Sequence, residues 1–428
     1  MNGTKYPYAL FLIRVIAVLS VCSFGNAQDK IIELRTADSL LGKTIGGEEV
    51  RELIGNVHLV QTSSAGEVIK LWCDRALRYM TQNKAELFGN VRLLRDSTEL
   101  RAAEGIYYGD EKRAVMKKSV RLQRGSMTLT SNAGEYFSEE QRAHFTGEVV
   151  VVDSASITYS DRLTYFEEDE RSIAVGNVRV VNPDQAMTVY GDSLVHFGKI
   201  HYTLVPKNPR LVQIDTTDDG TVDTLVIVSR LMEAFKVPSD RFIATDSVLI
   251  ARSDLSATSG RAIYFTKRDQ MILEHQPIVW YGENQVMGDS MVVSMEDRKL
   301  RSVYVRGRAM AVSRADTAYV NRFDQLTGRE LTMYFANQKL ERIEAVRNAI
   351  SLYYVFDESR PNGANRASGD RIRIDFIDGI VNDITVVGGV QGEYYPENMM
   401  MNREHRYNLD GFRWIEKRPR RQNLNILQ

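Results

Sequence analysis

A Gly-Asp-Ser-Leu block at Gly191–Leu194 is the most explicit candidate for chemistry in this chain. In one class of serine lipases such a block carries the nucleophile, which a histidine activates by taking the hydroxyl proton. The pattern recurs as Gly288–Met291, and Asn402–His405 does not supply the Asp-x-x-His partner expected near the C-terminus. Because a triad is defined by geometry and roles rather than by a string, we predict no catalytic residues and keep ester hydrolysis at Ser193 as an alternative to be tested.

Metal-binding residues are sparse and poorly spaced. Of the six histidines only His196 and His201 lie close together, and no cysteine accompanies them. Asp215–Gly220 has the composition of a calcium loop, but Val226 stands where an EF-hand needs its glutamate. A polar hairpin therefore explains this stretch better. The chain also lacks a phosphate-binding loop, a dinucleotide fingerprint and a zinc-protease helix, so we predict no metal and no cofactor.

Composition narrows the class of protein. The 428 residues are 43% hydrophobic and 26% charged, which is typical of a globular chain rather than a disordered one. The 55 basic and 56 acidic residues are nearly balanced. A general nucleic-acid binder needs a basic face, so no nucleic-acid partner is expected.

Residues 1–27 have the features of a secretory signal. Lys5 and Arg14 supply positive charge, the run 15–24 is apolar, and the small residues 25–27 precede Gln28. Arg14 leaves the apolar run shorter than the ~20 residues of a membrane-spanning helix. We predict cleavage, and the alternative is an uncleaved anchor. After cleavage Cys73 is the one remaining cysteine, which excludes an internal disulfide.

A repeat runs through the first half of the chain. Valines recur at intervals of 34, 29, 29 and 29 residues, and most follow a Gly-Asn or Gly-Glu pair: Val57, Val91, Val120, Val149 and Val178. Half a period away, Tyr107, Tyr136 and Tyr165 are each 29 residues apart. A period of this size indicates one supersecondary unit stacked on copies of itself. Such a fold offers an elongated surface rather than a single catalytic pocket.

Alternating apolar and polar residues predict β-strands throughout. Val91 and Leu93 face one way while Arg92 faces the other, and we find no long amphipathic helix. Each unit is expected to read as a turn, a strand that opens at the valine, a second turn and an aromatic strand. Sheets of this kind have one dry and one wet face. We predict a segment at 28–214, a second, degenerate segment at 225–396 with a seam near 215–223, and a C-terminal tail at 397–428 that is solvated from Arg413 onward.

These features together resemble the OstA-like family, which includes the lipopolysaccharide-transport protein LptA and the periplasmic N-terminal domain of its outer-membrane partner LptD. The similarity rests on the leader, the β pattern, the repeated Gly-Asn-Val and the apolar-Tyr-Phe strand, and it is clearest from Glu52 to Phe197. The resemblance implies an all-β fold, a V-shaped β-jellyroll of two sheets with an apolar groove, here in two consecutive segments. It also implies a periplasmic location.

The partners implied by the resemblance are lipopolysaccharide or a similar glycolipid, other β-jellyrolls of the Lpt type, an LptD-like outer-membrane protein and, by end-to-end contact, further copies of this chain. We predict that the groove, which would hold acyl chains by burying methylenes, is lined by Val57, Leu59, Val91, Leu93, Val120, Leu122, Val149, Val151, Val178 and Val180. Two alternatives remain open. The same residues could form an ordinary packed core of a structural or interaction protein of the envelope, or the chain could be a membrane-anchored, LptC-like relative.

Overall fold

A computed structural model gives the fold. It describes residues 30–424 except 64–67, 96, 138, 217–219, 221, 237, 254, 297–298, 317, 338, 358–359 and 378–379. The predicted leader therefore lies outside the described residues. The described chain is almost entirely antiparallel β-structure, which confirms the all-β prediction. It divides into two compact units, unit 1 up to Lys207 and unit 2 from Asn208.

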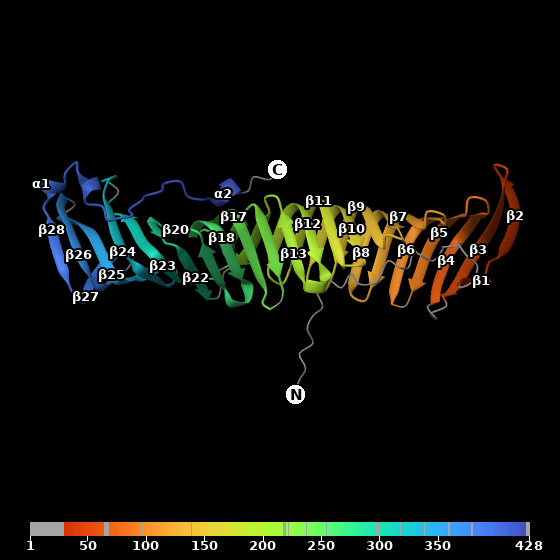
Figure 1. Cartoon of the computed structure of the whole chain (residues 1–428), viewed down its shortest axis with the longest axis horizontal. Helices are drawn as coiled ribbons and strands as arrows, with labels where there is room; N and C mark the ends of the chain where they lie inside the picture. Colours follow the sequence, from red (N-terminus) through yellow and green to blue (C-terminus); the bar gives the residue numbers. More distant parts are fainter. Residues whose placement is uncertain are drawn as a thin grey trace, which may run out of the picture. The chain divides into compact units, whose positions relative to one another are not determined.

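Unit 1 is a meander in which each long strand pairs with the next (Figure 1). Its strands are β1 (Lys30–Thr36), β2 (Ser39–Ile45), β3 (Glu48–Ser63), β4 (Val68–Tyr79), β5 (Lys84–Arg95), β6 (Thr98–Tyr108), β7 (Arg113–Arg124), β8 (Met127–Phe137), β9 (Arg142–Val152), β10 (Ile157–Phe166), β11 (Arg171–Asn182), β12 (Met187–Phe197) and β13 (Tyr202–Pro206), with the 3₁₀ turn η2 (Gly198–Ile200) before β13. One 29-residue repeat is thus a pair of adjacent strands.

Each long strand bends sharply near its middle. The pairing register shifts there, for example between Phe88 and Val91 of β5. Gly89 and Asn90 occupy the bend with φ of 71° and 46°, in the left-handed region that favours glycine and asparagine. The prediction that Gly-Asn precedes a strand was therefore wrong: the pair lies inside the strand and turns it, so that its two halves belong to two facing layers.

An aspartate fixes each Gly-Asn bend: Asp74 and Asp161 lie on the neighbouring strand, and Asp38 lies just before β2. The Nδ2 of Asn90 donates a hydrogen bond to Oδ2 of Asp74 at 2.9 Å, and a Cβ added at Gly89 would lie 2.1 Å from the same oxygen. Asn177 and Gly176 meet Asp161 in the same way. Glycine is required here both by the backbone angle and by the carboxylate above it.

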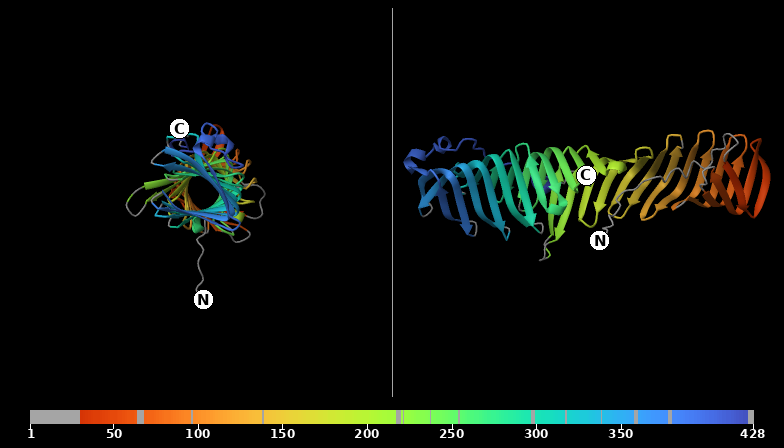
Figure 2. Two further views of the ribbon diagram at one scale, coloured as in Figure 1. Left: turned by 90° about the vertical axis from the view of Figure 1, so that its left-hand side faces the viewer. Right: turned by 60° about the horizontal axis from the view of Figure 1, so that its bottom comes forward.

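Unit 2 repeats the bent strand in two forms. Its strands are β14 (Arg210–Thr216), β15 (Val222–Val228), β16 (Leu231–Phe235), β17 (Arg241–Ala251), β18 (Leu255–Phe265), β19 (Gln270–Glu274), β20 (Ile278–Tyr281), β21 (Asn284–Met287), β22 (Ser290–Glu296), β23 (Lys299–Arg314), β24 (Phe323–Ala336), β25 (Lys339–Asp357), β26 (Arg360–Ile377), β27 (Ile380–Val387) and β28 (Gln391–Tyr395), with the 3₁₀ turn η3 (Thr266–Arg268) between β18 and β19. β23 to β26 are continuous and bent. β21 and β22 instead form the two halves of one interrupted strand, and both pair with β23. The end-on view in Figure 2 shows the strands of unit 2 curving around their interior.

The stretch near 215–223 is a hairpin. β14 and β15 pair from Arg210 with Val228 to Thr216 with Val222, which confirms the polar hairpin. The division between the two units falls earlier in the chain, between Lys207 and Asn208.

The C-terminal segment packs against unit 2, and the prediction of a solvated stretch from Arg413 onward was wrong, because Trp414 contacts one core cluster and Leu424 is buried in another. It contains α1 (Glu397–Met400), η4 (Glu404–Arg406) and α2 (Arg421–Leu424). In Figure 1 it runs back from β28 past β20 to α2. Met400 and Leu409 are buried in one core cluster, which Phe412 and Trp414 also contact. The side chain of Gln285 clamps its backbone by bonding both the carbonyl of Arg413 and the N–H of Ile415.

Candidate functional site

Five valines mark the inner side of the bends in unit 1. Each faces a small residue on the next strand: Val57 with Cys73, Val91 with Ala102, Val120 with Ser131, Val149 with Ser160 and Val178 with Gly191. The five valines are 0–2% exposed. We call these pairs the valine row. Short side chains on both members of each pair let the two layers approach closely beside the bend.

A second row runs parallel to the first, two residues further along the strands. Directly paired across β3 to β9 are Leu59, Leu71, Leu93, Leu100, Leu122, Leu129 and Val151. We call this the leucine row. Thr158 and Val180 continue it onto β10 and β11. At ~4.8 Å between neighbouring strands, the six steps from β3 to β9 give an uninterrupted aliphatic stripe about 29 Å long.

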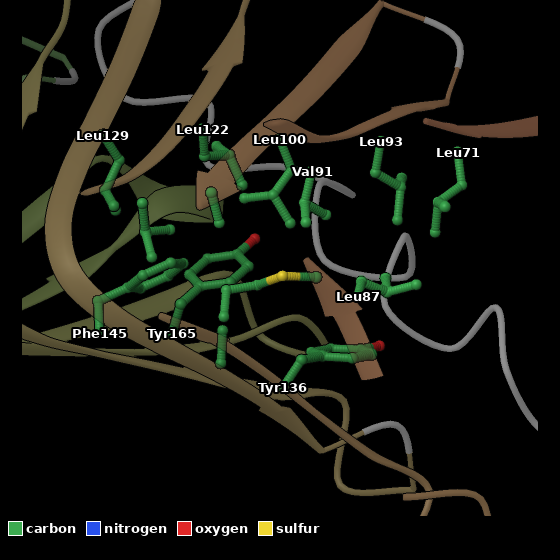
Figure 3. Close-up of a cluster of buried hydrophobic side chains, with 14 of the residues drawn as sticks. Leu71, Leu87, Val91, Leu93, Leu100, Leu122, Leu129, Tyr136, Phe145 and Tyr165 are labelled. Atoms are coloured by element: carbon green, nitrogen blue, oxygen red, sulfur yellow. The ribbon is translucent and has the colours of Figure 1, made fainter. Parts of the chain in front are cut away.

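The facing layer alternates large and small side chains. Tyr107, Ala114, Tyr136, Ala143 and Tyr165 pair in that order across β6 to β10. Figure 3 shows Tyr136, Tyr165 and Phe145 opposite the leucine row, and all belong to one buried cluster. The alanines make room for the rings on either side, so the large side chains of neighbouring strands interdigitate.

The residue after each inward tyrosine points outward and closes the hairpin. Phe137 and Phe166 pair with Arg142 and Arg171, whose guanidinium carbons lie 4.3 and 4.5 Å from the ring centroids. The repeated apolar-Tyr-Phe signature thus combines an interior ring with a cation–π contact on the outside.

The sequence of this unit has recognisable relatives. Residues 28–188 match the family model described as OstA-like protein. This segment contains the leucine row and four of the five pairs of the valine row, so the resemblance predicted from the repeats is confirmed for it. The match covers less than half of the chain.

Two further comparisons add little to the OstA-like match. The crystal structure of LptH from Pseudomonas aeruginosa, described as the LptA homologous periplasmic component of the conserved lipopolysaccharide transport device, is similar at 13% sequence identity with a TM-score of 0.18. The similarity covers 35% of this chain and 82% of LptH. A search of the curated proteins gives no match.

Eight of the ten residues predicted to line the groove are buried at 0–4% exposure, and Leu59 and Val180 are half-buried. All ten lie in the OstA-like segment and either belong to the two rows or continue them. The leucine row also contains three residues of the even-numbered strands that the prediction missed: Leu71, Leu100 and Leu129. Their strict alternation with polar neighbours, as in Thr128-Leu129-Thr130, was the available signal. The rows pack against the facing layer, so the interior is closed.

Polar atoms gather at one end of this interior. Ser172 pairs with both Tyr165 and His196 across neighbouring strands. The Tyr165 hydroxyl, the Ser172 hydroxyl and His196 Nε2 are buried with no hydrogen-bond partner in the described part of the chain. Burial lowers the pKa of His196 to about 4, and its Nδ1 lies 2.8 Å from Thr203 Oγ1. His196 is therefore a neutral, packed histidine at pH 7.

The remaining candidates for chemistry lie in strands. Ser193 pairs with Val175 inside the β11–β12 ladder rather than at a strand end. Cys73 is buried in the valine row, and burial raises the pKa of its thiol to about 12, which makes it a poor nucleophile. Within the described ranges no group of three His, Cys, Asp or Glu residues could hold a metal. No described helix is long and apolar enough to span a membrane.

Proposed function

We propose that unit 1 is a periplasmic carrier segment that shelters the acyl chains of lipopolysaccharide or a similar glycolipid between its two layers. The observation that carries this proposal is the leucine row, an aliphatic stripe without a charged residue that lies within a segment matching the OstA-like family. Each methylene buried against such a stripe contributes about 0.8 kcal/mol. A hydrocarbon tail needs no polar partner there and can slide between near-equal positions.

The closed interior sets a condition on this function. Because the rows are nearly inaccessible, a tail can enter only if the two halves of the bent strands move apart. The bends at Gly55, Gly89, Gly147 and Gly176 are the places where such opening would occur. The same closed packing favours the alternative of a structural or interaction protein without lipid, so direct detection of lipid decides between them.

The edge of unit 1 supports a bridging role. β2 pairs with β3, and all seven of its residues are exposed. Leu40, Leu41 and Ile45 are 60, 42 and 41% exposed. An exposed strand with apolar side chains invites another strand to extend the sheet. Another β-jellyroll, an LptD-like outer-membrane protein or a second copy of this chain would fit this edge.

Photo-crosslinking in the native envelope tests the proposal. A photoreactive residue at Leu122, in the leucine row, should capture glycolipid, whereas the same residue at the adjacent Arg121, which is exposed on β7, should not. Val120→Asp, which places a carboxylate in the valine row, should abolish capture at Leu122, provided that circular dichroism shows a folded chain. Equal capture at both positions, or none at Leu122, would reject an acyl-chain site.

A further inference from the structure

A hollow of about 510 Å³ opens on unit 2 and is rich in arginine. It lies where the bends of β23, β24 and β25 meet β26 and the chain around η4. Five arginines line it: Arg308, Arg329, Arg347, Arg366 and Arg406. Asp410 is the one carboxylate residue among the described residues of the lining. We call this hollow the arginine pocket.

Three of these arginines stand at the bends themselves. Arg308, Arg329 and Arg347 fall within the register shifts of their strands, where residues leave the hydrogen-bonded ladder. All three are exposed. The bends of β23, β24 and β25 thus bring three cations to one hollow.

Two of them hold an unfavourable backbone conformation. Arg308 has φ of 44° and Arg347 has φ of 64°. At the position of Arg308, unit 1 has asparagine in its Gly-Asn bends, and asparagine tolerates the left-handed region better than a long side chain, which costs roughly 1 kcal/mol or more there.

The charge of the pocket is only partly neutralised. Arg308 pairs with Asp289, and Arg347 pairs with Glu330 at 2.7 Å. Arg366 contacts the Tyr395 hydroxyl. Arg329 and Arg406 have no carboxylate partner within the described ranges. The guanidinium groups of Arg329 and Arg406 are therefore available to an anion.

We propose that the arginine pocket binds a phosphorylated sugar, and, on the basis of the proposed function, that this is the headgroup of a glycolipid of the same class as the one that unit 1 carries. Guanidinium forks chelate phosphate oxygens with two parallel hydrogen bonds. Tyr395 and Tyr407, with ring centroids 4.8 Å apart, and the amides of Asn348 and Asn408 supply a surface for the sugar and donors for its hydroxyls.

Binding of a water-soluble ligand to the full chain tests the pocket without involving acyl chains. The probe is an acyl-free glucosamine phosphate, measured by isothermal titration calorimetry beside inorganic phosphate. Arg329→Gln and Arg406→Gln should each weaken its binding about tenfold, since one charge-assisted hydrogen bond is worth about 1.4 kcal/mol or more. Arg360→Gln is the matched control: Arg360 is exposed on β26, as Arg366 is, but does not line the pocket.

Three results would overturn the pocket's assignment: equal affinity in all four proteins, binding of the sugar phosphate no tighter than that of inorganic phosphate, or tighter binding to vesicles of phosphatidylglycerol than to the sugar phosphate. Val120→Asp should leave binding of the sugar phosphate unchanged. Failure of the lipid crosslink in unit 1 and failure of the arginine pocket are thus separate outcomes.

Discussion

The two units use the same bent strand but complete their interiors differently. In unit 1 the leucine row, the valine row and the facing tyrosines come from the strands alone. In unit 2 a core cluster takes Met400 and Leu409 from the C-terminal segment, with Phe412 and Trp414 packed against it. A bent sheet therefore leaves an apolar side that another segment can occupy. In unit 2 the C-terminal segment occupies that side, whereas in unit 1 the facing layer of strands fills it.

The bends of the two units also differ in the residue that contacts the aspartate. Three bends of unit 1 use Gly-Asn pairs held by an aspartate, such as Asn90 with Asp74. In unit 2 the corresponding contact is made by an arginine: Arg308 donates to Asp289 from Nε at 2.9 Å. Both arrangements satisfy the aspartate, but the second adds a long cation to the surface. The same fold thus gives an apolar interior in one unit and a basic outer pocket in the other.

The largest expected effect comes from detaching the C-terminal segment. Arg322 is 4% exposed and binds both carboxylate oxygens of Glu397 at 2.9 and 2.6 Å. Arg322→Met leaves that carboxylate and Glu404 without their cation, and breaking a buried pair in this way costs about 3–5 kcal/mol. Unit 2 should unfold at lower urea while unit 1 is unchanged, as followed by peptide-resolved hydrogen exchange.

The matched control for Arg322 is Arg301→Met. Arg301 of β23 pairs with Glu296 of β22 at 2.8 Å, and the two side chains are 66 and 64% exposed, so its removal should cost less than about 1 kcal/mol. Similar losses in the two variants would show that the C-terminal segment is not anchored by the buried pair.

The two units should respond to pH in opposite directions. Burial lowers the pKa of His196 in unit 1 to about 4 from 6.5. The contribution of neutral His196 to the free energy of unfolding is fully present above pH 6.5 and is lost as the pH falls toward 4. Burial raises the pKa of Asp324 in unit 2 to about 7 from 3.8. Its contribution is present below pH 4 and is lost as the pH rises through 7. Each effect amounts to roughly 3–4 kcal/mol at 1.36 kcal/mol per pKa unit.

Urea unfolding of each unit between pH 4 and pH 8 measures this difference. His196→Gln should reduce the loss of stability of unit 1 at acid pH, and Asp324→Asn should reduce the loss of stability of unit 2 as the pH rises. If both units keep parallel pH profiles in the wild-type protein, the buried states assigned to these two groups are wrong.

The sequence predicted the parts of this structure that follow from period and alternation. A period of 29 and the alternation around Val120 and Leu122 were enough for the all-β fold and for a set of inward residues. The bend was missed because a Gly-Asn pair at positive φ is also the signature of a hairpin turn. Only the contact of Asn90 with Asp74, 16 residues earlier, distinguishes the two.

The C-terminal segment and the arginine pocket were missed for a different reason. Residues 397–424 have no period and are rich in charge, as a solvated tail would be, and their burial depends on long-range contacts such as that of Gln285 with Arg413. The arginines of the pocket are scattered over 98 positions of the chain, from Arg308 to Arg406. Neither arrangement leaves a local pattern, since the register of several strands creates both.

The smallest expected effect separates a bend from an ordinary turn. Gly176 has φ of 83°, and an added Cβ would lie 2.2 Å from Oδ2 of Asp161. Gly282, in the turn between β20 and β21, has φ of 55° with no atom within 4 Å of an added Cβ. Gly282→Ala should cost about 1 kcal/mol from backbone strain alone. Gly176→Ala should cost about 2 kcal/mol more, because the Asp161 carboxylate must also move.

A double-mutant cycle isolates the carboxylate from the backbone. In an Asp161→Ala background, the cost of Gly176→Ala measured by urea unfolding should fall to that of Gly282→Ala, because the strain remains while the clash is gone. An undiminished cost would mean that the bends of unit 1 depend on backbone angle alone. The aspartate would then be free to vary, and the exchange of asparagine for arginine at the bends of unit 2 would need no change in its partner.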